Sequence, residues 1–340
     1  SRELLAEMAR EAELVVAVSD FSKGLLCDLC PDSRDKISRI YNGIELDDFP
    51  AAAAPEPRPA LRLVSVGRLI EFKGFQHLIE ACGLLRDAGV AVEARIIGEG
   101  PLRGELEARI AQSGLTGQVR LLGVRSQEEI KRELACADLF VLPSIIASAG
   151  ASDILPTVIT EAMACRLPVV STTVAGIPEM VLHEKTGLLT PPGDAAALAA
   201  AIRQLGADPA TRENMGEAGR RHAEATFSFA ATAAVLGQRL EQICTTGKAP
   251  DRQELPIVYF CPRWQGQNVA QHGPRLGDGV RWIASELDVP IGDADRTSLA
   301  ETEFLPDASV IESLWLRRAD ARQALEAARN KLSDHVSGTA

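Results

Sequence analysis

The chain has 340 residues, of which 46% are hydrophobic and 24% are charged, and its formal net charge is -11. This length suits about two domains, and the balance of apolar and charged residues excludes a disordered chain. No run approaches the roughly 20 apolar residues that span a bilayer. The acidic excess disfavours nucleic acid as a partner, so we expect a small-molecule ligand.

The first 45 residues contain the patterns of a strand, a helix and a second strand, over 14–18, 22–29 and 36–40. Such a short stretch cannot close a hydrophobic core by itself. An Ala- and Pro-rich segment over 51–59 follows, which is typical of a linker. We therefore expect residues 1–55 to be the end of one domain and its linker.

Six short apolar runs then alternate with amphipathic helical patterns. Strands of a parallel sheet are covered on both faces and are therefore continuously apolar, as these runs are. The alternation predicts an α/β fold, a Rossmann-like doubly wound parallel sheet. Its strands are expected over 61–66, 92–97, 119–122, 139–142, 169–172 and 187–190.

The helices between these strands carry start and stop signals. A helix over 75–88 ends before Gly89. Ser126 and Glu129 form a capping box for the helix that runs to Cys136. Asp194 caps a helix over 195–205, and the charged segment 211–243 predicts one or two more. We take residues 56–245 as one domain.

The composition changes beyond residue 247, because the three tryptophans, Trp264, Trp282 and Trp315, all lie there. We expect residues 246–340 to form an unassigned α-rich extension, with a helix over 311–332. The tryptophans are expected to anchor a core and not to form a sugar platform.

Two cations follow the first of the six strands, in the segment V-G-R-L-I-E-F-K-G. The strand ends at Gly67, and Arg68 and Lys73 come before the next helix. Backbone N–H groups, a helix dipole and a guanidinium at such a turn suit a bound anion. We interpret the segment as a diphosphate clamp; a solvated loop with chance charges is the alternative.

Two glycines follow the second strand, in I-I-G-E-G-P. Gly98 and Gly100 would let a ligand approach the backbone closely, although a plain tight turn explains them equally well. The third glycine of a dinucleotide fingerprint is missing, which disfavours a nicotinamide enzyme.

Two acids, Asp153 and Glu161, stand eight positions apart after the fourth strand. Pro156 suits a helix start, which places Asp153 in a loop and Glu161 about one turn into the helix. The two carboxylates could then reach different parts of one extended ligand and accept hydrogen bonds from sugar hydroxyls. Taken singly, Asp153 is explained as an N-cap-type residue and Glu161 as a solvated helix acid.

These segments form one ordered pattern with further short motifs: G-R-L-x-x-x-K-G, G-x-G-P, P-S before an acid, L-P-T-V, E-A-M-A, A-G-I-P-E and G-L-L-T-P-P-G-D. The pattern resembles the donor-binding half of the family-4 retaining glycosyltransferases, which have the GT-B fold. The resemblance covers about residues 13–243, including S-D-F-S-K from Ser19 and I-Y-N-G-I from Ile40.

The resemblance implies transfer of a sugar from a nucleotide diphosphate sugar, with retention at the anomeric carbon and without a metal or other cofactor. It implies that Arg68 and Lys73 hold the diphosphate, Glu161 the ribose and Asp153 the hydroxyls of the donor sugar, with Arg68, Lys73 and Asp153 as the catalytic set. The further donor-binding residues it implies are Gly67, Gly98, Gly100, Val124 beside the nucleobase, and Gly176.

Three positions depart from the family pattern. Asp153 stands where the family has glutamate, and Ile154 replaces the glycine that normally follows this acid. Arg166 stands where the family usually has glycine after E-A-M-A-x.

The resemblance also sets expectations about the biological role. We expect synthesis of a polysaccharide or glycolipid on the cytoplasmic side, with a sugar or lipid-linked acceptor and a location in the cytoplasm or peripherally at the inner face of the membrane. The family's acceptor domain precedes the donor domain, and we expect only its last strand and helix to fall within this chain. The alternatives are a sugar-nucleotide epimerase of the same fold and a non-catalytic sugar-nucleotide-binding module.

Overall fold

The computed structural model describes residues 2–49, 59–245, 254–260, 281–284 and 312–317. They fall into two compact units, one of residues 43–229 and the other of the residues before 43 together with the described residues from 230 onward. The sequence predicted three consecutive segments, whereas the structure groups the two ends of the chain. None of the described helices is both long enough and apolar enough to cross a membrane.

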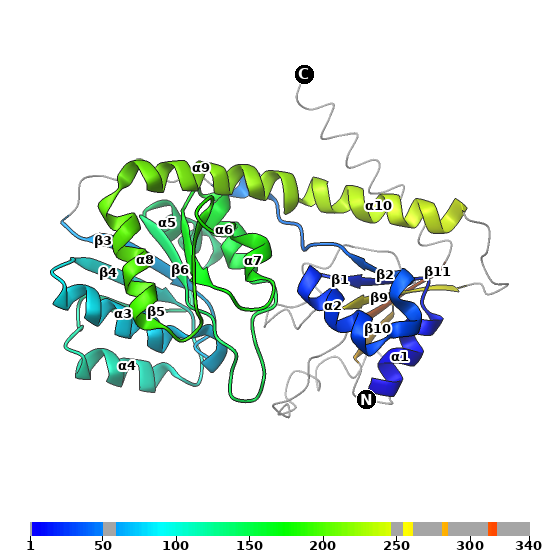
Figure 1. The fold of residues 1–340 in the computed structure, drawn as a ribbon, viewed down its shortest axis with the longest axis horizontal. Coiled ribbons are helices and arrows are strands. Elements are labelled where there is room, and N and C mark those ends of the chain that lie inside the picture. The colour runs from blue at the N-terminus through cyan, green and yellow to red at the C-terminus, as the bar shows by residue number, and fades with distance from the viewer. Residues whose placement is uncertain (1, 50–58, 246–253, 261–280, 285–311, 318–340) are drawn as a thin grey trace, which may run out of the picture. The chain divides into compact units, whose positions relative to one another are not determined.

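The unit of residues 43–229 is built on a six-stranded, all-parallel sheet (Figure 1). The strand order is β5-β4-β3-β6-β7-β8, so the winding direction reverses between β3 and β6. The predicted doubly wound sheet and all six strands are confirmed. They are β3 (Leu61–Val66), β4 (Val92–Ile97), β5 (Val119–Gly123), β6 (Leu139–Leu142), β7 (Val169–Thr172) and β8 (Gly187–Thr190).

The helices of this unit begin at the predicted caps. Ser126 and Glu129 form the capping box of α5, and Asp194 accepts a hydrogen bond from the backbone of α8. The elements are η2 (Leu46–Asp48), η3 (Glu71–Lys73), α3 (Phe75–Asp87), α4 (Arg103–Gln112), α5 (Gln127–Ala135), α6 (Thr157–Ala164), α7 (Ile177–Met180), α8 (Ala195–Ala207) and α9 (Pro209–Thr226).

Helices cover the strands of this sheet so that β6 and β7 are buried along their whole length. Helix α3 packs against α4 and α8, and α6 packs against α9. Phe75, Leu78 and Phe140 are among the fully buried side chains. Each such side chain stabilises the fold by about 1.5–3 kcal/mol relative to an exposed one.

The other unit has a five-stranded sheet with the order β10-β11-β9-β1-β2. Strand β1 is parallel to both β2 and β9, and β11 is antiparallel to both β9 and β10. The elements are α1 (Arg2–Glu11), β1 (Leu14–Ala17), α2 (Asp20–Leu29), η1 (Pro31–Lys36), β2 (Ile37–Arg39), α10 (Phe229–Thr245), β9 (Glu254–Phe260), β10 (Arg281–Ala284) and β11 (Glu312–Arg317).

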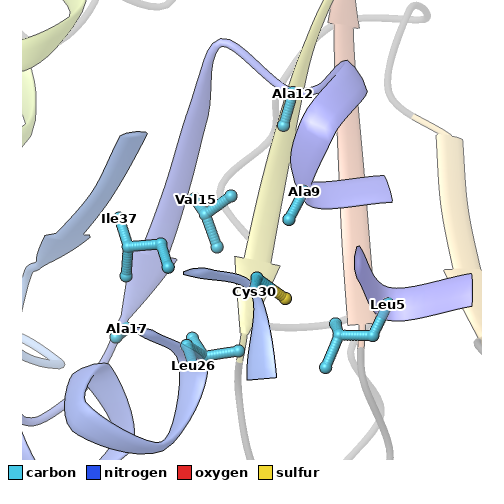
Figure 2. Close-up of a cluster of buried hydrophobic side chains, with 8 residues drawn as sticks. All are labelled: Leu5, Ala9, Ala12, Val15, Ala17, Leu26, Cys30 and Ile37. Atoms are coloured by element: carbon cyan, nitrogen blue, oxygen red, sulfur yellow. The ribbon is translucent and has the colours of Figure 1, made fainter. Parts of the chain in front are cut away.

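Strand β1 carries buried side chains on both of its faces, because successive side chains of a strand point to opposite sides. Val15 and Ala17 belong to a cluster with residues of α1 and α2, which Figure 2 shows. Leu14 and Val16 face the opposite way, where Leu236 of α10 packs. This explains why the N-terminal strand has a continuous apolar sequence.

The predicted α-rich extension is wrong where the structure describes it. Residues 254–260, 281–284 and 312–317 are strands, and the last of these lies within the segment that was expected to be helical over 311–332. Pairing with β1 and β9 decides the conformation, since β9 joins the edge of β1 and β11 joins β9. Trp282 and Trp315 lie on β10 and β11, and Trp264 lies outside the described residues.

Candidate functional site

The loops at the carboxyl ends of β3 and β6 meet where the winding of the sheet reverses, which is where open α/β sheets bind ligands. Lys73, on the first loop, donates a hydrogen bond from Nζ to Oδ1 of Asp153, on the second, at 2.7 Å. The two side chains are only 9% and 10% exposed. Two residues that the sequence singled out separately thus form one buried ion pair.

Ser144 completes the surroundings of Asp153. Its Oγ donates to Oδ2 of Asp153 at 2.7 Å, and its carbonyl accepts a hydrogen bond from Thr172 Oγ1 at 2.5 Å. Ser144 is the serine of the P-S motif, and it was not predicted to be a site residue. Its position directly behind a buried strand was the available signal.

Two glycines determine the path of the Lys73 side chain. Gly74 has φ +68°, and a Cβ there would lie 1.9 Å from the carbonyl oxygen of Pro143. A Cβ on Gly67 would lie 3.2 Å from Cδ and Cε of Lys73. The lysine stem therefore lies against Gly67, and only glycine lets the chain turn so closely at position 74.

Gly98 and Gly100 lie against the backbone of the β3–α3 loop. A Cβ on Gly98 would stand 1.9 Å from the carbonyl oxygen of Gly67, and one on Gly100 would stand 2.5 Å from that of Leu69. Leu69 also donates its N–H to the carbonyl of Glu99 at 2.9 Å. The turn therefore joins two loops, and its predicted contact with a ligand stays a prediction.

The guanidinium of Arg68 is exposed, and within the part of the chain that the structure describes it has no hydrogen-bond or ion-pair partner. Lys73 and Arg68 flank the same short turn after β3. One cation is therefore fixed by an acid, and the other is free to bind an anion.

Glu161 lies on α6, as predicted, and its carboxylate has no partner among the described residues. Burial raises the pKa of Glu161 to about 7, and the nearby ammonium of Lys131 opposes this shift. A partly buried acid without a partner has unused acceptor capacity, which a hydroxyl-bearing ligand would satisfy.

Gly176 lies between β7 and α7 and contacts the backbone of the loop that carries Asp153. Its N–H donates to the carbonyl of Ile154 at 3.0 Å, and it precedes α7. The backbone of Ile154 is thus held in spite of the missing glycine. Val124 follows β5 and is 71% exposed, and its carbonyl accepts a hydrogen bond from the neighbouring Arg125.

The long loop after β6 is also tied to η3. Ser148 donates from its backbone N–H and its Oγ to the carboxylate of Glu71, at 2.9 and 3.1 Å, and Ile145 N–H donates to the carbonyl of Phe72 at 2.9 Å. The segment that leads to Asp153 is therefore anchored to the segment that carries Lys73.

Among the described residues, no three His, Cys, Asp or Glu side chains gather into a group that could hold a metal ion. Cys27 and Cys30 are free thiols at the end of α2. Burial raises the pKa of Cys30, which keeps this thiol protonated.

The sequence model of the family described as "Glycosyl transferases group 1" matches residues 51–222. The amylovoran biosynthesis glycosyltransferase AmsK of Erwinia amylovora is 39% identical over 214 residues, which are 63% of this chain and 52% of that protein. The putative colanic acid biosynthesis glycosyltransferase WcaL of Escherichia coli K12 is 38% identical over 206 residues, 59% and 50% of the two chains. The chain thus spans about half the length of these relatives.

Solved structures share the fold. The Anabaena protein Alr3699/HepE in complex with UDP has a TM-score of 0.60 and 25% identity, over 68% of this chain and 65% of that one. Sucrose-phosphate synthase from Thermosynechococcus elongatus has a TM-score of 0.62 and 28% identity, over 72% and 62%.

Proposed function

The chain belongs to the glycosyl transferases group 1 family, and from this premise we propose that it binds a nucleotide diphosphate sugar whose sugar is transferred to an acceptor. The observation that carries the proposal is the buried pair of Lys73 and Asp153, which joins the loops after β3 and β6 where the winding of the parallel sheet reverses, inside the matched residues. Arg68 is exposed on the first of these loops, and Glu161 lies on α6, the helix that follows the second. Two cations and an unpartnered acid match the charges and hydroxyls of such a ligand.

The cations act on the diphosphate. When the bond from the sugar to the diphosphate breaks, negative charge accumulates on the departing oxygen. The ammonium of Lys73 and the guanidinium of Arg68 stabilise this charge, and they cost little reorganisation because the loop already holds Lys73. The first N–H groups of α6, which begins at Thr157, add to the positive potential.

Glu161 binds the ribose in this proposal. Its carboxylate accepts hydrogen bonds from two hydroxyls when it is ionised, and its pKa of about 7 allows the ligand to shift it toward that form at neutral pH. The surrounding loops approach closely at four glycines, Gly67, Gly98, Gly100 and Gly176. Val124 directly follows β5, and in this proposal it borders the nucleobase.

We further propose retention at the anomeric carbon, as the resemblance to retaining enzymes implies, and a role in making a polysaccharide on the cytoplasmic side. The relatives named for amylovoran and colanic acid biosynthesis support the polysaccharide role.

Calorimetric titration of the chain with UDP and with GDP tests the proposal, and binding of one of them is the expected result. Proton NMR of a mixture with UDP-glucose or GDP-mannose then separates the reactions. A transferase moves the sugar to the hydroxyl of an added acceptor sugar, releases the nucleoside diphosphate and gives a product with the donor's anomeric configuration, whereas an epimerase returns a sugar that is still bonded to the diphosphate. No binding of either diphosphate would reject the proposed function.

A further inference from the structure

Both carboxylate oxygens of Asp153 already have hydrogen-bond partners within the protein. Oδ1 accepts from Lys73 and Oδ2 accepts from Ser144, each at 2.7 Å, and the side chain is buried. To contact a sugar hydroxyl in place of these partners, Asp153 would have to break its buried hydrogen bonds to Lys73 and Ser144, which is unfavourable. A glutamate would extend one methylene further from the same backbone.

We propose that Asp153 is a positioning residue for Lys73 and does not contact the transferred sugar; this inference rests on the proposed function, because it concerns how the same site holds a diphosphate. An ammonium has three donors, and Asp153 occupies one of them. Two remain for phosphate oxygens.

Positioning strengthens diphosphate binding through conformational entropy. A free lysine side chain loses several rotamers when it binds, whereas the stem of Lys73 already lies against Gly67 and its end is held by Asp153. This gain does not depend on whether a sugar is attached to the diphosphate.

The strand ends hold Asp153 in turn. Thr172 Oγ1 donates to the carbonyl of Ser144 at 2.5 Å, and the neighbouring Ser171 Oγ donates to the carbonyl of Leu142 at 2.6 Å. Both hydroxyls are buried. The chain of hydrogen bonds from β7 through Ser144 to Asp153 and Lys73 is therefore continuous.

The test compares UDP with UDP-glucose by calorimetry on the full chain and on Asp153→Asn, Lys73→Met and the double variant. GDP and GDP-mannose replace them if the wild-type chain binds GDP more tightly. Asp153→Asn is expected to weaken both ligands by the same factor, about tenfold. The double variant is expected to bind within about threefold of Lys73→Met alone, because the two residues act as one unit. Glu105→Gln, which removes an exposed carboxylate on α4, is the matched control and is expected to change neither affinity.

Two results would overturn the positioning role while leaving the proposed function intact. Loss of UDP-glucose affinity alone would make Asp153 a sugar contact, and tighter UDP binding by Asp153→Asn would make the pair an obstacle that the ligand has to break. If Asp153→Asn does not fold, Ser144→Ala replaces it and is expected to weaken both ligands equally, by a few-fold. If the wild-type chain binds neither diphosphate, the proposed function fails and the positioning role fails with it.

Discussion

The carbonyl oxygen of Gly67 lies 1.9 Å from the point where a Cβ on Gly98 would stand. Gly98 also has φ +140°, which side chains rarely adopt. The loops after β3 and β4 therefore meet backbone to backbone. The fold itself requires glycine at position 98, whether or not this residue also contacts a ligand.

Gly98→Ala is expected to destabilise the fold by several kcal/mol, because the methyl group would overlap backbone that cannot move independently. Gly83→Ala is the matched control, since Gly83 lies within α3 and has nothing within 4 Å of its Cβ position. It is expected to stabilise by about 0.5–1 kcal/mol. Urea unfolding of the two variants measures both changes, and an equal effect would contradict the close packing of the loops.

Arg68→Ala is expected to weaken binding of the nucleoside diphosphate about ten- to a hundredfold, since a charge-assisted hydrogen bond contributes about 1.5–3 kcal/mol. Stability should be unchanged, because within the described residues the guanidinium has no partner to lose. Arg109→Ala removes an exposed cation paired with Glu105 on α4 and serves as the control. Calorimetry that gives equal affinities for both variants would remove Arg68 from the site.

Glu161→Gln is expected to change how stability depends on pH. The pKa of Glu161 is about 7 in the folded chain and 4.5 for an ordinary glutamate, so the folded state holds a proton that the unfolded state releases between these values. The wild-type free energy of unfolding therefore falls as pH rises from about 4.5 to about 7, and glutamine does not show this loss. The variant should become more stable than wild type across this window, by on the order of 1 to 3 kcal/mol above pH 7.

Urea unfolding of both proteins at intervals from pH 4.5 to pH 8 measures this difference. A difference that stays constant over the whole range would show that Glu161 titrates normally. In the proposed function the same variant binds diphosphate more weakly, so gain of stability and loss of affinity should appear together.

Arg166→Gly is expected to stabilise the chain. Arg166 has φ +58°, in the left-handed region, and a Cβ on Gly216 would lie 2.0 Å from its carbonyl oxygen, so the backbone has no room to relax. Its ion pair with Glu217 is exposed and contributes little. Arg166→Ala keeps the backbone strain and removes the ion pair, so it isolates the backbone effect. Arg166→Gly should exceed Arg166→Ala by about 1 kcal/mol in the free energy of unfolding, and equal values would contradict this explanation.

Much of the unit of residues 43–229 could be predicted because strands such as β6 and β7 are buried on both faces. A continuous apolar run such as Leu139–Leu142 indicates a strand with helices on both faces of its sheet. Ser126 and Asp194 mark helix starts, because each caps its helix through contacts within a few residues. These features are local, so the sequence displays them.

The contacts between the site residues could not be predicted from the sequence. Lys73 and Asp153 were both named, yet their pairing depends on how two loops 80 positions apart come together, and so does the role of Ser144. Strand β11 was missed for the same reason: its conformation is set by β9 and β10 and not by its own composition.

The pairing of β1 with β9 has a consequence for the order in which the chain folds. All of residues 43–229 leave the ribosome between these two strands, and their sheet needs no strand from elsewhere. Domains generally fold as units during synthesis, so this middle part of the chain can reach its native state first. The pairing of β1 with β9 has to wait until residues 254–260 have been made, and over that interval the unpaired backbone groups on this edge of β1 are open to chaperones and to mispairing with another nascent chain.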